Sequence, residues 1–324
     1  MAMSSFAKSP ESASCATRSA GPERTTKRTE SNMARVGWVG FGEIGEPMAL
    51  RLIAAGHEVH VWGRTAARLT PATDRGARLA ASPADLASAC DFVFLCITDA
   101  DAVEQTVFGA EGVARGASPG KLLIDHSTIH PLRSRALAAR LREERGMGWL
   151  DAPVSGGAIG AQQGTLSIFV GGEETDLEKA RGVMGAYAAK ITRVGESGAG
   201  LVAKCVNQTV LCATLAAWAE ALNLAHRAGA DVARVLEALE GSWADSPVRR
   251  LHAPSMISAD YAPGQAWTML KDLDVVGDMA QLTKSPMPVQ AIVTSLFRQQ
   301  IAMGFDHTGI PGIMNVYHEG PLKR

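Results

Sequence analysis

Lys204 belongs to a set of residues whose types and spacing could do proton chemistry. Lys204, Asn207, Gln208 and Leu211 fall at positions i, i+3, i+4 and i+7, so a helix would place them on one face. A lysine that can give a proton stabilises a developing alkoxide and completes an alcohol, while an amide beside it can orient the reacting group. Taken alone, however, the pattern favours a lysine that reaches solvent near the start of a helix.

Three glycines near the other end of the chain have the spacing G-x-G-x-x-G. A strand-like run ends at Gly40, a helical period follows Gly45, and a second strand is expected over Glu58 to Trp62. In such a βαβ unit the first glycine allows a tight turn, the second lets the backbone approach a pyrophosphate, and the third lets the helix pack closely. A plain tight turn is the alternative. The residues expected to contact a dinucleotide here are Gly40, Phe41, Gly42, Glu43, Ile44 and Gly45.

The end of the second strand favours NADP over NAD. An NAD site usually carries an acidic residue there to hold the ribose 2′-hydroxyl, whereas this stretch reads Gly63, Arg64, Thr65. The guanidinium of Arg64 could pair with a 2′-phosphate as a planar fork, and the hydroxyl of Thr65 could add a bond. The alternative is that Arg64 is an ordinary solvated loop residue.

Length and composition bound the class of protein. The chain has 324 residues and a net charge of −1, with no basic run, so we expect no nucleic-acid partner. The longest apolar stretch, 209–225, contains Glu220 and is too short and polar for a membrane span. Five cysteines without a C-x-x-C pair indicate free thiols and a cytoplasmic location. Residues 1–33, rich in Ser and Thr, are expected to be a disordered, dispensable tail.

The pattern of expected strands and helices shows where the candidate site residues lie in the fold. Strand signals over 91–98 and 121–128 are apolar, as buried parallel strands require, and helical signals alternate with them. The sequence therefore predicts an α/β fold, with a doubly wound Rossmann-type parallel sheet over 34–196. After it the pattern changes, and residues 198–230 show no strand signal and read as one long helix. Ligands should gather at the carboxyl ends of the strands. Those ends carry Ile97, Thr98, Thr128, Ser155, Gly156 and Gly157.

Four motifs in order carry a family resemblance: GFGEIGEPM, DAPVSGG, GAG-x₃-K-x₂-N-Q and KDLD. Together they resemble the β-hydroxyacid dehydrogenase family, which includes 3-hydroxyisobutyrate dehydrogenase, tartronate semialdehyde reductase and the glyoxylate/succinic semialdehyde reductases. The resemblance covers residues 34 to about 275 clearly and the rest loosely. It implies an oxidoreductase that interconverts a small β-hydroxy or short-chain hydroxy acid and its semialdehyde or oxo acid by hydride transfer, and the end of the second strand makes it NADP(H)-dependent.

The resemblance also implies roles for single residues. Lys204 would be the general acid or base and Asn207 its orienting neighbour. The substrate carboxylate would be held by Ser155, Gly156 and Gly157, and Lys271 would reach the nicotinamide side of the cleft. Ile97, Thr98 and Thr128 would lie along the cofactor, with Thr128 and Lys271 close enough to contact substrate as well. Residues 197–324 would be an all-helical C-terminal domain, joined to the sheet by a long interdomain helix, and this domain would form the contact of a homodimer or homotetramer.

Several alternatives stay open. Trp267 and Met269 precede Lys271, where they could alter the outer wall of the pocket, so the substrate is not identified. An imine reductase of similar fold would usually carry Asp or Tyr in place of Lys204, and a non-catalytic scaffold could lose this lysine. His126 and His307 are weaker candidates for a general acid and for a substrate contact across a dimer. No His, Cys and Asp cluster has the spacing of metal ligands, so no metal is expected.

Overall fold

The computed structural model describes residues 33–322, and nearly all of the predicted N-terminal tail therefore lies outside the described residues. Within the described range the strands are β1 (Arg35–Val39), β2 (Glu58–Trp62), β3 (Arg78–Leu79), β4 (Phe92–Leu95), β5 (Leu122–Asp125), β6 (Gly148–Asp151), β7 (Val154–Ser155), β8 (Leu166–Gly171) and β9 (Ala188–Gly195). The helices of the same range that cover or follow this sheet are α1 (Gly45–Ala54), η2 (Ala66–Leu69), α2 (Thr70–Thr73), α3 (Pro83–Ala89), α4 (Ala100–Phe108), α5 (Val113–Gly116), α6 (Pro131–Arg145), α7 (Gly157–Gln163), α8 (Glu174–Met184), α9 (Ala199–Arg227), α10 (Val232–Ala238), α11 (Pro247–Ser258), α12 (Ala266–Thr283), α13 (Pro288–Ala302) and η3 (Ile310–Val316).

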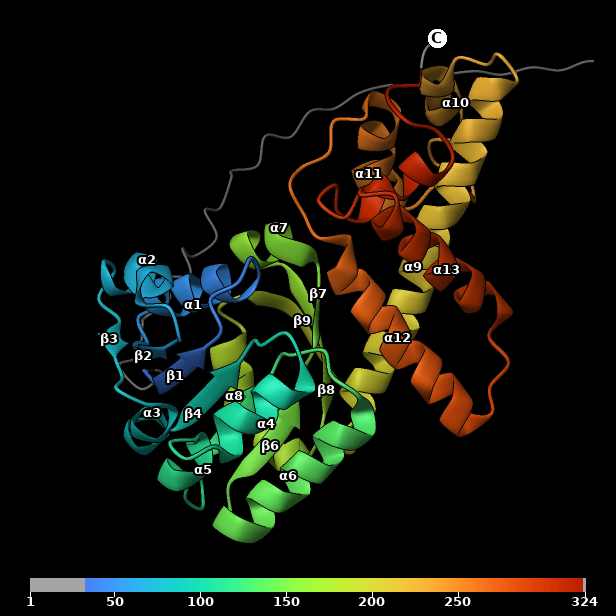
Figure 1. Cartoon of the computed structure of the whole chain (residues 1–324). Helices are drawn as coiled ribbons and strands as arrows, with labels where there is room; N and C mark the ends of the chain where they lie inside the picture. The colour runs from blue at the N-terminus through green and yellow to red at the C-terminus, as the bar shows by residue number, and fades with distance from the viewer. Residues whose placement is uncertain (1–32, 323–324) are drawn as a thin grey trace, which may run out of the picture. The chain divides into compact units, whose positions relative to one another are not determined.

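The strands form one sheet in the order β3-β2-β1-β4-β5-β6-β8-β7, with β9 beside β8 (Figure 1). The chain reverses its direction of winding between β1 and β4, where a doubly wound sheet binds its ligand. The predicted fold class is confirmed, but the expectation of an all-parallel sheet is wrong at one end: β8 runs antiparallel to β6 and β7. The link from β7 to β8 contains only the short helix α7, which is too short for a crossover between parallel strands.

Alternating side chains of the strands fill two cores, one on each face of the sheet. On β1, Val36 and Trp38 belong to the core covered by α1, α2 and α8. Val39 belongs to the opposite core, covered by α3, α4, α5 and α6. Gly37 faces Leu86 of α3 so closely that a Cβ at this glycine would lie 2.0 Å from a leucine methyl. Both faces of the sheet are thus buried, which leaves the carboxyl edge of its strands for ligands.

Helix α9 carries the predicted catalytic face and is attached directly to the sheet. Figure 1 shows it running from the sheet to the helices α10–α13, and it packs against β8, α11, α12 and α13. Its start is fixed by Asp151 at the end of β6. The two carboxylate oxygens of Asp151 accept the N–H groups of Gly198 (2.6 Å) and Leu201 (3.1 Å). A carboxylate at a helix N-terminus satisfies free donors and interacts favourably with the helix dipole.

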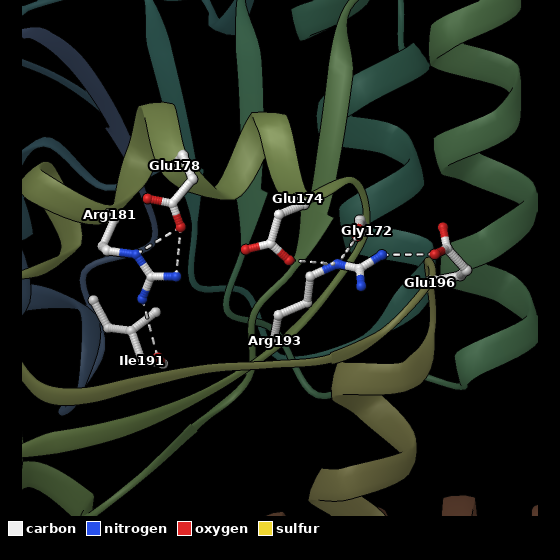
Figure 2. A network of polar contacts seen from close by, with 7 residues as sticks. All are labelled: Gly172, Glu174, Glu178, Arg181, Ile191, Arg193 and Glu196. Atoms are coloured by element: carbon white, nitrogen blue, oxygen red, sulfur yellow. Dashed lines mark hydrogen bonds and ion pairs between the residues drawn. The ribbon is translucent and has the colours of Figure 1, made fainter.

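The turn before α9 is held by a second set of polar contacts, shown in Figure 2. Arg193 of β9 donates to the carbonyl of Gly172 (2.7 Å) and to the carboxylate of Glu196 (2.6 Å), and Glu174 lies 3.5 Å away. Arg135 of α6 donates to the carbonyl of Ser197 at 2.6 Å. Because residues of β9 and α6 both hydrogen-bond to this turn or its neighbours, the first turns of α9 have a fixed position relative to the strand ends.

The length of α9 corrects one expectation. The apolar stretch judged too short for a membrane span is part of a helix of 29 residues, whose most apolar window has a mean hydropathy of 1.3 and meets the length and composition of a span. The core helix of a globular protein passes the same test. Cys212, Leu215, Ala219 and Leu222 of α9 are buried in the core formed with α11, α12, α13 and η3. This packing accounts for part of the hydropathy of α9, since 39% of its most apolar window is buried.

Candidate active site

The glycine loop between β1 and α1 has the shape of a phosphate cradle. Gly40 has φ = +104°, and a Cβ there would lie 2.1 Å from the carbonyl oxygen of Cys96. A Cβ at Gly45 would lie 2.1 Å from the carbonyl oxygen of Gly40, so loop and helix approach closely. Around Gly42, in contrast, no atom lies within 4 Å of a Cβ position. Open space over the second glycine fits the approach of a pyrophosphate.

A cavity of about 590 Å³ opens beside this loop. It is bounded by the ends of β1, β2 and β4 and by the segment that follows α4. Of the residues predicted to bind the cofactor, the cavity is lined by Gly40, Phe41, Gly42, Gly63, Arg64, Thr65, Ile97 and Thr98. The other predicted cofactor residues, which do not line it, are Glu43, Ile44, Gly45, Thr128 and Lys271. The cavity therefore brings together the glycine loop and the end of β2, as a dinucleotide with a phosphorylated ribose would require.

Arg68 of η2 is a further cation on this cavity that sequence reasoning missed. It lines the same cavity as Arg64 and, like Arg64, is exposed. The available signal was its position four residues after Arg64, in the short segment that follows β2 and contains η2. Among the described residues, the segment after β2 thus presents two guanidinium groups to the cavity, and the acidic residue of the lining, Glu111, comes from the segment after α4.

Thr128 and Lys271 join the sheet to the helical part. The ammonium of Lys271, on α12, donates to the carbonyl of Thr128 at 2.7 Å. One residue earlier, the hydroxyl of Ser127 accepts the N–H of Ile97 at 2.9 Å. The loops after β4 and β5 are therefore held together, and Lys271 is anchored at the edge of the sheet where Thr98 lines the cavity.

Lys204 is buried near the N-terminal end of α9. Its side chain is on the face predicted from the sequence, only 9% of the residue is exposed, and Nζ donates to the carbonyl of Val154 at 3.0 Å. The next residue of β7, Ser155, donates its hydroxyl to Oδ1 of Asn207 at 3.3 Å. The structure thus brings together Lys204, Asn207 and Ser155 from two of the four motifs.

A chain of hydrogen bonds continues from this group to α12. Nδ2 of Asn207 donates to Oε1 of Gln208 (2.9 Å), and Nε2 of Gln208 donates to Oδ2 of Asp272 (2.7 Å). Oδ1 of Asp272 lies 3.1 Å from the ammonium of Lys271. Asp272 stands in the KDLD motif, but its role was missed because spacing alone does not show that α12 crosses α9 at Gln208.

Burial lowers the pKa of Lys204 from its usual value. The positive charge of Lys271 acts in the same direction, whereas the negative charge of Asp272 opposes the shift. A lysine with a lowered pKa changes protonation more readily near neutral pH and can act as an acid or a base.

The backbone beside Ser155 is open. Gly156 and Gly157 have φ values of +130° and +62°, which side chains rarely adopt, and nothing lies within 4 Å of a Cβ position at Gly157. A hydroxyl beside an unobstructed backbone suits an anionic group such as a carboxylate.

The two histidines weighed from the sequence lie elsewhere. His126 is buried, with Nδ1 2.6 Å from the carbonyl of Ala152 and Nε2 2.9 Å from the hydroxyl of Tyr187. A carbonyl only accepts, so Nδ1 carries the proton and Nε2 accepts from the tyrosine. Burial lowers the pKa of His126 to about 4, which keeps the ring neutral in the core. His307 is exposed, and its carbonyl accepts the N–H of Gly264.

The cradle, the cavity and the buried lysine define a class: an NAD(P)-dependent oxidoreductase with a Rossmann-type sheet. The family model for the NAD-binding domain of 6-phosphogluconate dehydrogenase matches residues 35–195. The model for the NAD-binding domain of NADP-dependent 3-hydroxyisobutyrate dehydrogenase matches residues 198–317. The chain belongs to the β-hydroxyacid dehydrogenase family, as its motifs predicted.

Individual relatives agree with this assignment. A 2-hydroxy-3-oxopropionate reductase of Escherichia coli is 35% identical over 284 residues, which cover 85% of this chain and 95% of the relative. The structure of a 3-hydroxyisobutyrate dehydrogenase of Mycobacterium tuberculosis with L-serine is 28% identical, with a TM-score of 0.81, and covers 89% of this chain and 100% of its own. An imine reductase from a Pseudomonas species is 20% identical, with a TM-score of 0.61 over 89% of this chain and 100% of its own, and shows the fold alone.

Proposed function

We propose that the protein reduces a short oxo acid or semialdehyde to its β-hydroxy acid with NADPH, and catalyses the reverse reaction with NADP⁺. The observation that carries this proposal is the burial of Lys204 beside Asn207 and Ser155. An acidic ammonium in a site of low dielectric can stabilise an alkoxide and protonate it. The relatives named for the reduction or oxidation of hydroxy acids support this choice.

In the reaction, the bound nicotinamide supplies or receives the hydride. Lys204 holds a proton at Nζ and delivers it to the substrate oxygen during reduction, or removes it during oxidation. Asn207 cannot transfer a proton at neutral pH, so its amide orients the oxygen. Ser155 and the open backbone at Gly157 would hold the substrate carboxylate.

The preference for NADPH is supported by Arg64, Thr65 and Arg68 on the cavity. Two guanidinium groups suit a doubly charged 2′-phosphate, while the hydroxyl of NADH has no charged partner there.

Substrate and cofactor can be tested together. Purified protein would be assayed with glyoxylate, succinic semialdehyde, tartronate semialdehyde and methylmalonate semialdehyde, each with NADPH and with NADH, and with a cyclic imine as a competing substrate. We expect the highest kcat/KM for an aldehyde acid with NADPH. Turnover of the imine alone would replace the proposal with imine reduction, and no turnover despite nucleotide binding would indicate a non-catalytic scaffold.

We also propose that two copies of the chain associate through α9, as a homodimer or within a homotetramer. Val202, Val206 and Val210 lie at i, i+4 and i+8 on α9, with 38%, 61% and 62% of each residue exposed. Such an apolar stripe is typical of a helix that another copy covers. Light scattering should give a multiple of 34.1 kDa, which Val206→Glu lowers. Val194→Glu, at an exposed valine of β9, is the control. A monomeric wild-type protein would contradict the proposal.

A further inference from the structure

Two carboxylates stand side by side at the carboxyl edge of the sheet. Asp125 and Asp151 are the last residues of β5 and β6, and they are paired in register as neighbours on parallel strands. They are 1% and 0% exposed. Neither carboxylate takes part in an ion pair within residues 33–322. Two neighbouring buried carboxylates repel each other when both are ionised, so the ionised pair needs compensation from hydrogen bonds or from positive charge.

The carboxylates of Asp125 and Asp151 differ in the number of their oxygens that accept a hydrogen bond. Both oxygens of Asp151 accept N–H groups at the start of α9. In Asp125, Oδ1 accepts the N–H of Ser127 at 2.9 Å, but Oδ2 is buried with no hydrogen-bond partner. Burial is the main cause that raises the pKa of Asp125 to about 7, and the charge of Asp151 adds to it. Burial likewise raises the pKa of Asp151 to about 6.

Asp125 lies at the carboxyl edge of the sheet, where the bound cofactor is expected to lie. A dinucleotide that enters at the β1/β4 switch point, with its pyrophosphate on the glycine loop, extends its second half across the ends of β4 and β5. Asp125 ends β5, and its hydrogen bond to Ser127 turns the carboxylate toward the loop that carries Thr128. The nicotinamide half would therefore pass over Asp125.

The charged and titratable neighbours of Asp125 come from three elements. Asp151 on β6 raises its pKa, and Lys271 on α12 lowers it. Cys96, after β4, is a neutral thiol because burial raises its pKa to about 12. His126, the next residue, stays neutral between Ala152 and Tyr187. Lys271 is itself engaged by Asp272 and by the carbonyl of Thr128, so it does not fully neutralise Asp125.

We propose that Asp125 is a positioning residue that senses the redox state of the cofactor: its ionised carboxylate stabilises the positively charged oxidised nicotinamide, and its protonated form favours the neutral reduced one. The inference rests on the binding of a nicotinamide cofactor in this cleft. A positive charge favours the ionised acid, so binding of the oxidised cofactor releases a proton from Asp125 near pH 7. The affinity for the oxidised cofactor should then rise with pH, while the affinity for the reduced cofactor gains nothing from this group.

The test is the ratio of Kd(NADPH) to Kd(NADP⁺) from about pH 5.5 to about pH 8.5, on wild type and on Asp125→Asn. In wild type we expect the ratio to rise about tenfold across this range, as for one charge acting at short distance. In Asp125→Asn the rise should be much smaller, with only the residual effect of Asp151, whose pKa of about 6 also lies in this range. The 2′-phosphate also titrates near pH 6, but it is common to both nucleotides and cancels in the ratio. A flat ratio in wild type, or the same rise in the variant, would overturn the inference.

A second measurement needs no variant. Calorimetry of wild type near pH 7, in two buffers that differ in ionisation enthalpy, gives the number of protons released on binding. Release with NADP⁺ that exceeds release with NADPH supports the inference, and equal release contradicts it. If neither nucleotide binds, the proposed function itself fails, whereas tight binding of both with equal proton release refutes only the role of Asp125.

Discussion

The open cavity beside β2 and the buried cluster around Lys204 hold their charges in different ways. Arg64 and Arg68 are exposed on the cavity, and an exposed guanidinium can attract a phosphate directly. Lys204 is 9% exposed, and it lies beside a chain of hydrogen bonds that runs from Ser155 to Lys271. Under the proposed function, the exposed cations would select the cofactor by electrostatic attraction, whereas the buried Lys204 would perform proton transfer because its surroundings lower its pKa. The two regions should therefore respond differently to substitution, salt and pH.

The largest effect is expected at the buried cluster. Lys204→Ala should lower kcat for reduction by roughly 10²-fold or more, as for loss of a general acid that also stabilises the oxyanion. Affinity for NADPH should hardly change, since the cavity is untouched. Lys190→Ala, at an exposed lysine of β9, is the control and should keep wild-type turnover. Wild-type kcat in Lys204→Ala would remove this residue from the mechanism.

The next effect is expected at the open cavity. Arg64→Ala should weaken NADPH binding by about 10- to 100-fold, because a charged hydrogen bond to phosphate contributes about 1.5–3 kcal/mol. NADH binding should hardly change, and added salt should reduce the wild-type preference since the site is exposed. Arg68→Ala should act in the same direction. The measurement is the Kd of both nucleotides at two salt concentrations. A wild-type preference for NADH, or equal losses for both nucleotides, would make NAD the cofactor.

A smaller effect is expected from Asp272, which acts on Lys204 through its charge. In Asp272→Asn the amide keeps the size of the side chain but loses the charge that opposes the lowered pKa of Lys204. The pH at which reduction declines should move lower, and kcat above that pH should fall by roughly tenfold, the effect of removing one nearby charge. A fall in kcat with an unmoved pH profile would indicate a purely structural role for Asp272.

These predictions draw on residues that the sequence revealed to different degrees. The glycine loop, the strand Glu58–Trp62 and the face of α9 with Lys204 follow from local period and spacing, which neighbouring residues determine. Arg68 and Asp272 were missed as site residues because their contacts depend on how distant elements meet. The antiparallel β8 was missed for a similar reason, since strand signals do not report direction. Local pattern thus predicts elements and motifs, while long-range packing decides which polar groups become partners.

The smallest catalytic effect is expected at the histidine in the core. Tyr187→Phe leaves the buried Nε2 of His126 without its donor, which should destabilise the fold by about 1–3 kcal/mol. Turnover by the folded protein should stay at the wild-type level, because His126 is neutral and bonded on both sides. Thermal unfolding and kcat, measured on one preparation, separate the two effects. A large loss of kcat at unchanged stability would return His126 to the mechanism.

The central claim, that Lys204 exchanges the proton with a lowered pKa, is tested most directly by the pH dependence of the chemical step in both directions. Single-turnover rates would be followed by nicotinamide absorbance for reduction and for oxidation. Reduction needs the protonated lysine, so its rate should be constant at low pH and fall as pH rises through the lowered pKa. Oxidation needs the neutral lysine, so its rate should rise through the same pH, and that inflection should lie below the usual lysine value. Rates without a shared inflection, or profiles that survive in Lys204→Ala, would contradict the account.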